Sequence, residues 1–249
     1  MDFYIDTEFR EGDHQAKKFG IKVGLPAKTI DLISIAIVNE YGEMYFALNS
    51  EHDLKATWQD EWLRESVLYP IYRMYINGFA MDMERFSLST MQHIFSTHGK
   101  TKTTIANEIQ IWINRLCGTS GINFYSYYGD YDWVVFCWLY GRMIDLPKEY
   151  PMYCRDLKQS LDELAEGGNY ERIYDNGRSL LKSAGKAKAE VPFETIGLEK
   201  ALEIIKKDKS FPALKNEHDC REDAKWNKSL HKFIKDKRLN NHIIILVDL

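Results

Sequence analysis

An alternating β-branched run near the N-terminus restricts the fold of this chain more than any other feature. Residues 29–38 read Thr-Ile-Asp-Leu-Ile-Ser-Ile-Ala-Ile-Val, and their period close to two predicts a strand. Residues 39–42, Asn-Glu-Tyr-Gly, have turn composition, and residues 43–48 can pair back as another strand. Residues 3–6 also alternate and predict a short strand at the start of the chain. Residues 1–48 therefore predict three antiparallel strands.

Helical periodicity dominates much of the remaining chain. Residues 101–116 place apolar side chains at helical spacing and predict an amphipathic helix. Residues 58–68 predict a helix that Pro70 ends. Residues 122–128 are predicted to form a strand, and residues 131–143 a buried helix. Residues 219–237 are predicted to form a long helix, and residues 242–247 a strand-like run. Strands with flanking helices indicate the mixed α/β class.

The length of 249 residues suits one large domain, and we predict a single domain over residues 1–249. Glycine and lysine are frequent near residues 10–28 and 166–192, which we predict to be insertions. We expect the first to be a loop or mobile excursion. We expect the second to be exposed and helical in part.

Composition excludes several classes of protein. With 45% hydrophobic and 28% charged residues, the chain is not expected to be intrinsically disordered. The net charge of −4 argues against a broad basic surface for nucleic acid, but it allows a local basic track or bound metal ions. No run of about 18 apolar residues occurs, so no membrane span is expected.

The cysteines and the N-terminus indicate a cytoplasmic protein. Four cysteines occur without a C-x-x-C spacing, which argues against a zinc ribbon and a dense disulfide framework. Reduced thiols in the cytoplasm are the expected state. The first ten residues carry three acids and no apolar segment, so a secretory signal is not expected.

The first candidate site pairs two acids on the first strand. Asp6 and Glu8 are two residues apart, so a strand directs both side chains to one face. Two carboxylates on one face of a core strand are costly unless a cation compensates them. The alternative is a hydrated strand end, because D-x-E alone is a weak motif.

A third acid follows the aromatic strand in the middle of the chain. Residues 122–128 are predicted to turn at Gly129 into the buried helix. Asp130 fits the N-cap of that helix, which is a structural role. Asp132 lies in the first turn of an otherwise apolar helix, where a carboxylate needs a partner.

A histidine and a fourth acid flank the start of the last long helix. Asp219 suits the N-cap of this helix, with Glu222 at the capping-box position. His218 precedes the cap and Asp223 lies in the first turn, so the two can share a site. The alternatives are acids that stabilise the helix dipole and a histidine on the surface.

Together these residues resemble the DEDDh branch of the RNase H-like 3′–5′ exonucleases. The four acids are Asp6, Glu8, Asp132 and Asp223, and the histidine is His218. Further segments are similar to one bacterial and phage exoribonuclease family of that branch: residues 29–35, 127–133, 141–147, 151–153 and 155–159. The matching segments span most of residues 1–160 and 214–227.

The resemblance implies a fold and a chemistry. It implies an RNase H-like mixed sheet, three antiparallel strands followed by parallel ones, flanked by helices. It implies two Mg²⁺ or Mn²⁺ ions held by the four acids, which suits hard cations that prefer carboxylate oxygens. His218 would accept the proton of the attacking water. The substrate would be nucleic acid with a free 3′ end, RNA preferred, and the product a 5′-nucleoside monophosphate.

Contacts to the substrate are predicted less directly. Thr7, between the two strand acids, would lie close to the terminal 3′-OH. Tyr128 and Trp133 could stack on terminal bases, or they could be core aromatics. Arg155 could contact a phosphate, or it could be a solvated charge.

The chain departs from the family at two places. About twenty residues intervene between the D-x-E strand and residues 29–35, and another excess lies between Leu164 and His218. Both departures leave substrate length, strandedness and a homodimer open. A DNA exonuclease of proofreading or repair type, a catalytically silent nucleic-acid-binding module and a metal-binding structural protein are the alternative functions.

Overall fold

The computed structural model describes residues 1–14, 17–18, 21–22, 25, 27–76, 85–117, 121–174, 187–191, 196–239 and 243–247. It separates into two compact units. The first unit comprises Met1–Asp156 and Leu214–Lys228, and the second comprises Leu157–Ala213 and Ser229–Leu249. The single exonuclease domain over 1–249 stays a prediction.

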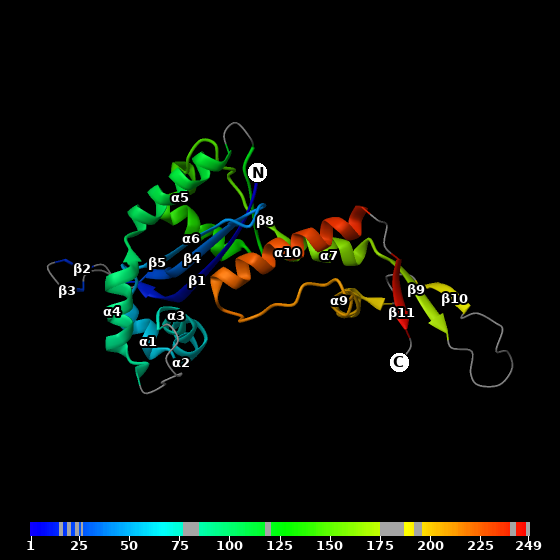
Figure 1. Ribbon diagram of the computed structural model, residues 1–249, viewed down its shortest axis with the longest axis horizontal. Helices are drawn as coiled ribbons and strands as arrows, with labels where there is room; N and C mark the ends of the chain where they lie inside the picture. The colour runs from blue at the N-terminus through cyan, green and yellow to red at the C-terminus, as the bar shows by residue number, and fades with distance from the viewer. Residues whose placement is uncertain are drawn as a thin grey trace. The chain divides into compact units, whose positions relative to one another are not determined.

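The first unit contains a six-stranded sheet in the order β6-β5-β4-β1-β7-β8. Figure 1 shows its strands β1, β4 and β5 side by side. The strands are β1 (Asp2–His14), β4 (Ala27–Asn39), β5 (Met44–Asn49), β6 (Gly99–Lys100), β7 (Asn123–Ser126) and β8 (Arg155–Asp156). β1, β4 and β5 are antiparallel, whereas β7 is parallel to β1 and β8 is parallel to β7. This sheet and its flanking helices confirm the mixed α/β class and the antiparallel-then-parallel arrangement expected of an RNase H-like fold.

Helices cover both faces of this sheet. On one face, Phe3 and Ile5 of β1 pack with α5 (Lys102–Cys117) and α6 (Asp130–Tyr140). On the other face, Ala36 and Val38 of β4 pack with the first turns of α10 (Cys220–Leu239). The two faces follow from alternation along β1 and β4, because successive side chains point to opposite sides of a strand.

A second hydrophobic cluster is built on short helices. Ile33 and Leu48 pack against α1 (Leu54–Gln59), α2 (Glu61–Leu63), a π-helical turn (Arg64–Leu68), α3 (Tyr69–Tyr75) and α4 (Leu88–His98). The prediction that Pro70 ends the helix was wrong. Pro70 lies in the first turn of α3, where its missing N–H leaves no helical hydrogen bond unmade.

The short first strand and the loop over residues 10–28 were also wrong predictions. β1 continues to His14 and pairs with β4 as far as His14↔Ala27, and β2 (Lys17–Lys18) pairs with β3 (Ile21–Lys22). Cross-strand hydrogen bonds supply the order that glycine and lysine composition does not indicate. Whether the insertion is mobile stays a prediction, and residues 15–16, 19–20, 23–24 and 26 lie outside the described residues.

The second unit contains α7 (Leu157–Glu166), α9 (Leu198–Lys206), the remainder of α10 and a three-stranded sheet. The sheet order is β10-β9-β11, with β9 (Asn169–Tyr174), β10 (Ala187–Val191) and β11 (Ile243–Val247). The strand-like C-terminal run is thereby confirmed. Within the predicted insertion, β9 and β10 pair as strands. Its helical part stays a prediction, because residues 175–186 lie outside the described residues.

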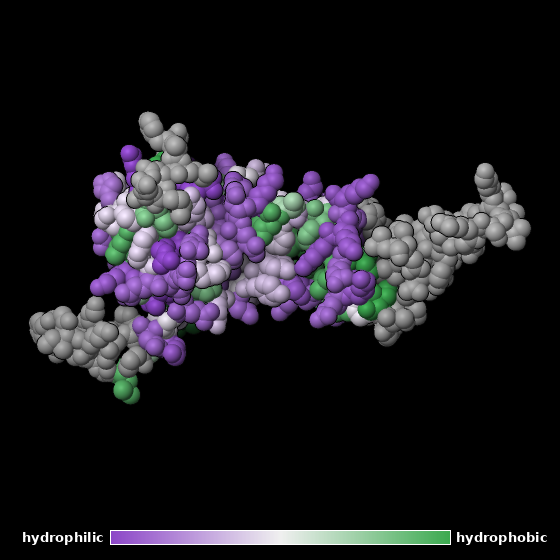
Figure 2. Space-filling model, turned by 90° about the horizontal axis from the view of Figure 1, so that it is seen from below, coloured by the Kyte–Doolittle hydropathy of each residue, from purple (hydrophilic) through white to green (hydrophobic). Residues whose placement is uncertain are grey.

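Three further observations concern helix hydropathy, the surface and the thiols. In the described part of the chain, no helix is both long and apolar enough to cross a membrane. The described residues on the face drawn in Figure 2 are mainly hydrophilic, with hydrophobic side chains among them. All four cysteines, at positions 117, 137, 154 and 220, are free thiols.

Candidate active site

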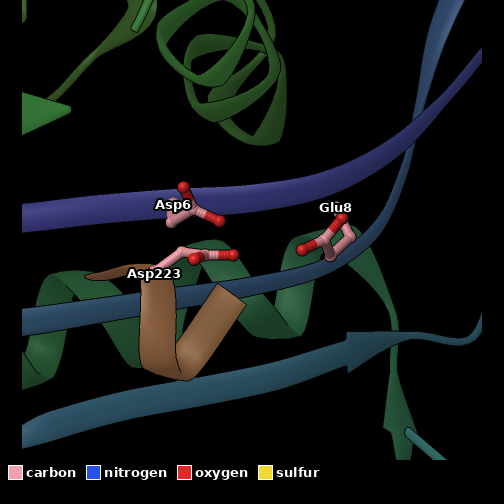
Figure 3. A group of neighbouring side chains, drawn as sticks. All are labelled: Asp6, Glu8 and Asp223. Atoms are coloured by element: carbon pink, nitrogen blue, oxygen red, sulfur yellow. The ribbon is translucent and has the colours of Figure 1, made fainter. Parts of the chain in front are cut away.

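Three carboxylates converge between β1 and the first turn of α10. Asp6 and Glu8 pair with Ala36 and Ser34 of β4, so both lie on the sheet face that α10 covers. The first turn of α10 adds Asp223 (Figure 3). One ligand atom from each of these acids lies within 4.8 Å of the other two. We call Asp6, Glu8 and Asp223 the carboxylate trio.

Burial and neighbouring negative charges raise the pKa of each carboxyl in the trio. Burial, followed by the charges of Asp132, Glu8 and Asp223, raises the pKa of Asp6 well above its ordinary value. Burial and the nearby charge of Asp223 raise the pKa of Glu8. Burial raises the pKa of Asp223 to about 7. A cation placed among these buried carboxyls would stabilise their ionised forms.

The donor set of the trio fits a hard divalent cation. Its ligand atoms are carboxylate oxygens, which Mg²⁺ and Mn²⁺ prefer, and no thiol belongs to the group. Soft metals select thiolate ligands instead. The residues therefore suit the Mg²⁺ or Mn²⁺ that the sequence predicted.

Asp132 lies beside the trio rather than in it. It is buried in the first turn of α6, where Oδ1 accepts the Thr7 backbone N–H at 2.8 Å and the Thr7 hydroxyl at 2.6 Å. The Ser126 hydroxyl donates to Oδ2 at 2.8 Å. Its charge still contributes to the raised pKa of Asp6. Burial raises the pKa of Asp132 itself, and the hydrogen bonds from Thr7 and Ser126 oppose that rise.

The end of β7 explains this position. β7 pairs with β1 only through Asp2↔Asn123 to Tyr4↔Tyr125, and it ends at Ser126. The N–H of Thr7 lies beyond that pairing, and the Asp132 carboxylate accepts it instead. The Thr7 hydroxyl donates to Asp132. A contact between Thr7 and the substrate stays a prediction.

Asp130 is not the N-cap of α6, so that prediction was wrong by one residue. Gly129 occupies the N-cap position, and its carbonyl accepts the Trp133 N–H at 2.9 Å. The Asp156 carboxylate accepts the Gly129 N–H at 2.9 Å and holds the turn. Asp130 is the first residue of the helix and is exposed.

Substitutions at the two aspartates of α6 should differ in stability. Asp132→Ala leaves the donors of Thr7 and Ser126 without their acceptor, so the free energy of unfolding at pH 6 should fall by about 1–3 kcal/mol. Asp132→Asn keeps a carbonyl oxygen and should lose less. Asp130→Ala should change the free energy of unfolding by less than about 0.5 kcal/mol. Urea denaturation measures all three, and equal effects of the two alanine variants would contradict this arrangement.

His218 lies next to Asp223, as predicted. Its backbone has a left-handed φ of 67°, and its N–H donates to Asp223 Oδ2 at 3.0 Å. The side chain is half-buried, and its ring contacts Trp62 of α2 with centroids 4.8 Å apart. The roles assigned to the four acids and to His218 stay predictions.

A pocket lies beside the trio, and some of the residues that line it were not indicated by the sequence. Glu8 and His218 lie on its wall with Ile71 and Met74 of α3 and with Arg221. Arg221 also binds the Asp219 carboxylate, with Nη2 at 2.6 Å from Oδ2. Helical periodicity over residues 69–75 could have indicated α3, but nothing local indicates that α3 lies beside the trio.

The three predicted substrate contacts have different surroundings. Trp133 is 8% exposed and packs on Phe124 and Phe136, which favours the core alternative over base stacking. Tyr128 is 64% exposed in a left-handed turn. Arg155 of β8 is exposed, and its guanidinium lies over the Tyr153 ring. Contacts of Tyr128 and Arg155 with a substrate stay predictions.

Comparison with known proteins adds independent information. No family model matches the chain. The chain is similar to two proteins named 3′-5′ exoribonuclease, from the CDC 1551 / Oshkosh and H37Rv strains of Mycobacterium tuberculosis. Each is 28% identical over 159 residues, which cover 64% of this chain and 73% of the relative.

Proposed function

We propose that this chain is a metal-dependent 3′–5′ exoribonuclease that releases 5′-nucleoside monophosphates from a free 3′ end. The observation that carries the proposal is the carboxylate trio with His218 bonded to one of its members. The similarity to two proteins named 3′-5′ exoribonuclease supports the direction and the preference for RNA. A cytoplasmic location is part of the proposal, and four free thiols support it. A homodimer stays a prediction.

The metal would be held by the trio together with Asp132. Two Mg²⁺ or Mn²⁺ ions, when bound, supply positive charge that stabilises the attacking and leaving oxygens of a phosphodiester. Asp6 and Glu8 would approach the ions from β1, and Asp223 from α10. Asp132 would contribute while its hydrogen bonds from Thr7 and Ser126 keep its carboxylate oriented.

Residues of the protein would accept the proton and contact the substrate. The oxygen of a water forms the new bond to phosphorus, and the bond from phosphorus to the 3′ oxygen of the preceding nucleotide breaks. His218 would accept the proton that the water loses, since a neutral imidazole is a proton acceptor near neutral pH. The leaving 3′ oxygen takes a proton from solvent. Tyr128 and Arg155 are exposed, and we assign them to contacts with a base and a phosphate.

End-labelled substrates test the function directly. RNA and DNA of one sequence, labelled at either end, would be incubated with Mg²⁺, Mn²⁺ or EDTA. We expect 3′-labelled RNA to release labelled mononucleotide at once and 5′-labelled RNA to shorten stepwise, with no reaction in EDTA. Faster cleavage of DNA would favour the DNA exonuclease. Binding without cleavage in both metals would favour the silent module and contradict the proposal.

A further inference from the structure

An exposed tryptophan lies against the His218 imidazole. The planes of the Trp62 and His218 rings meet at 71°, an edge-to-face contact of the kind that aromatic pairs prefer. Trp62 is nevertheless 55% exposed. Large aromatic side chains usually bury most of their surface in a core or an interface. Core packing therefore does not account for a tryptophan at this position.

The backbone around Trp62 is held firmly. Trp62 is the middle residue of α2, whose N-cap Asp60 accepts the Leu63 N–H at 3.0 Å. Leu63 is buried and packs in the cluster that contains Val67 and Leu68. Since these contacts already order the chain on both sides of Trp62, its contact with His218 costs little further conformational entropy.

The contacts of His218 fix its backbone more than its imidazole. The hydrogen bond to Asp223 uses the backbone N–H, and the left-handed φ also concerns the main chain. Among the described residues, none hydrogen-bonds to the imidazole. The Trp62 ring is thus a contact that restricts rotation of the imidazole about its side-chain bonds.

We propose that Trp62 is a positioning residue that holds the His218 imidazole in the orientation needed to accept a proton. The inference rests on the proposed function, in which His218 is the general base. A general base must lie within hydrogen-bond reach, about 2.6–3.2 Å, of the proton that it takes. Misplacement of a reacting group by 1 Å can cost about 10²-fold in rate. Trp62 would prevent such misplacement without touching the reacting atoms.

A double-mutant cycle separates this role from substrate binding. Trp62→Leu should lower kcat by about 10–100-fold with little change in KM. Trp62→Phe, which keeps an aromatic ring, should retain most of the rate. In the His218→Ala background, Trp62→Leu should change kcat by less than about twofold, because the group that it orients is gone. Trp138→Leu is the matched control, since Trp138 of α6 is 46% exposed and, among the described residues, has no ring contact with His218.

Two kinetic outcomes would overturn the inference. If Trp62→Leu lowers the rate equally with and without His218, or mainly raises KM, then Trp62 contacts the substrate instead. If Trp62→Leu keeps the wild-type kcat, the ring contact has no role in orientation. Trp62 is exposed, so its variants should fold, and circular dichroism checks this.

A spectroscopic readout keeps the inference separate from the proposed function. The measurement is the NMR spectrum of metal-free protein labelled on histidine. The imidazole signal of His218 is assigned as the one that disappears in His218→Ala. Trp62→Leu should shift this signal because the ring current of the indole is lost, whereas Trp138→Leu should not. An unchanged signal would refute the positioning role. A shifted signal in a protein that cleaves neither RNA nor DNA would refute the nuclease proposal alone.

Discussion

Asp6→Asn is expected to abolish the proposed ribonuclease activity and to stabilise the metal-free protein at pH 8. Burial and the charges of Asp132, Glu8 and Asp223 raise the pKa of Asp6 well above its ordinary value. Activity should fall by about 10³-fold or more, which corresponds to the loss of several kcal/mol of metal-dependent stabilisation. In EDTA at pH 8 the free energy of unfolding should rise by about 1–2 kcal/mol.

The sign of the stability change follows from proton binding. As the pH rises above the ordinary pKa of a carboxyl, the unfolded chain loses its proton first and the folded protein keeps it longer. The folded protein then binds more protons than the unfolded chain, so the free energy of unfolding falls with rising pH until Asp6 is ionised in both states. Removal of this carboxyl should therefore stabilise the metal-free protein at pH 8 and have less effect at pH 5.

Thermal unfolding in EDTA and in Mg²⁺ provides the measurement. A stabilisation of 1 kcal/mol should raise Tm by about 2–4 °C for a chain of this length. Mg²⁺ at a hundredfold excess over Kd should stabilise the wild type by about 2.7 kcal/mol and Asp6→Asn much less. Asp130→Asn is the control, because Asp130 is exposed and outside the trio. An Asp6→Asn protein less stable than wild type at pH 8 in EDTA would show that the ionised Asp6 does not destabilise the metal-free fold.

Features that depend on local sequence were predicted well. The alternation of residues 29–38 and 43–48 corresponds to β4 and β5, and the periodicity of residues 101–116 corresponds to α5. One face of α5 is buried, and β4 is buried on both faces from Leu32 to Val38, so the hydrophobic pattern of each element indicates its structure. The D-x-E spacing on β1 likewise placed Asp6 and Glu8 on one face.

Features that depend on distant partners were not predicted. β1 continues to His14 because β4 pairs with it, and β9 is a strand because β11, far along the chain, pairs with it. The composition of the first segment alone favours a loop, and that of the second favours an exposed, partly helical insertion. Pairing with a remote strand overrides that local preference.

The candidate site shows the same division. Asp132 was chosen from its place in a helical turn, but its bond to Thr7 depends on where β7 ends. The contact between Trp62 and His218 joins α2 to the start of α10, and no spacing in the sequence indicates it. Local patterns therefore identified residue types suited to the chemistry, whereas the tertiary fold determines which of them touch.

His218→Ala is expected to lower kcat by about 10²–10⁴-fold, the usual contribution of a positioned general base. Metal binding should change little, because the trio and Asp132 remain. The fold should also persist, since the alanine keeps the backbone N–H that donates to Asp223. His218→Asn should be similarly slow, because an amide does not accept the proton.

Rescue by a free base distinguishes this role from a structural one. The missing side chain leaves space beside Glu8 and Ile71 in the pocket that His218 lines. Added imidazole should enter this space and restore part of the rate of His218→Ala, while the wild type stays unaffected. Asp223→Ala removes a member of the trio, so imidazole should not rescue it. If His218→Ala retains near-full activity, His218 only precedes the helix, and another group must accept the proton.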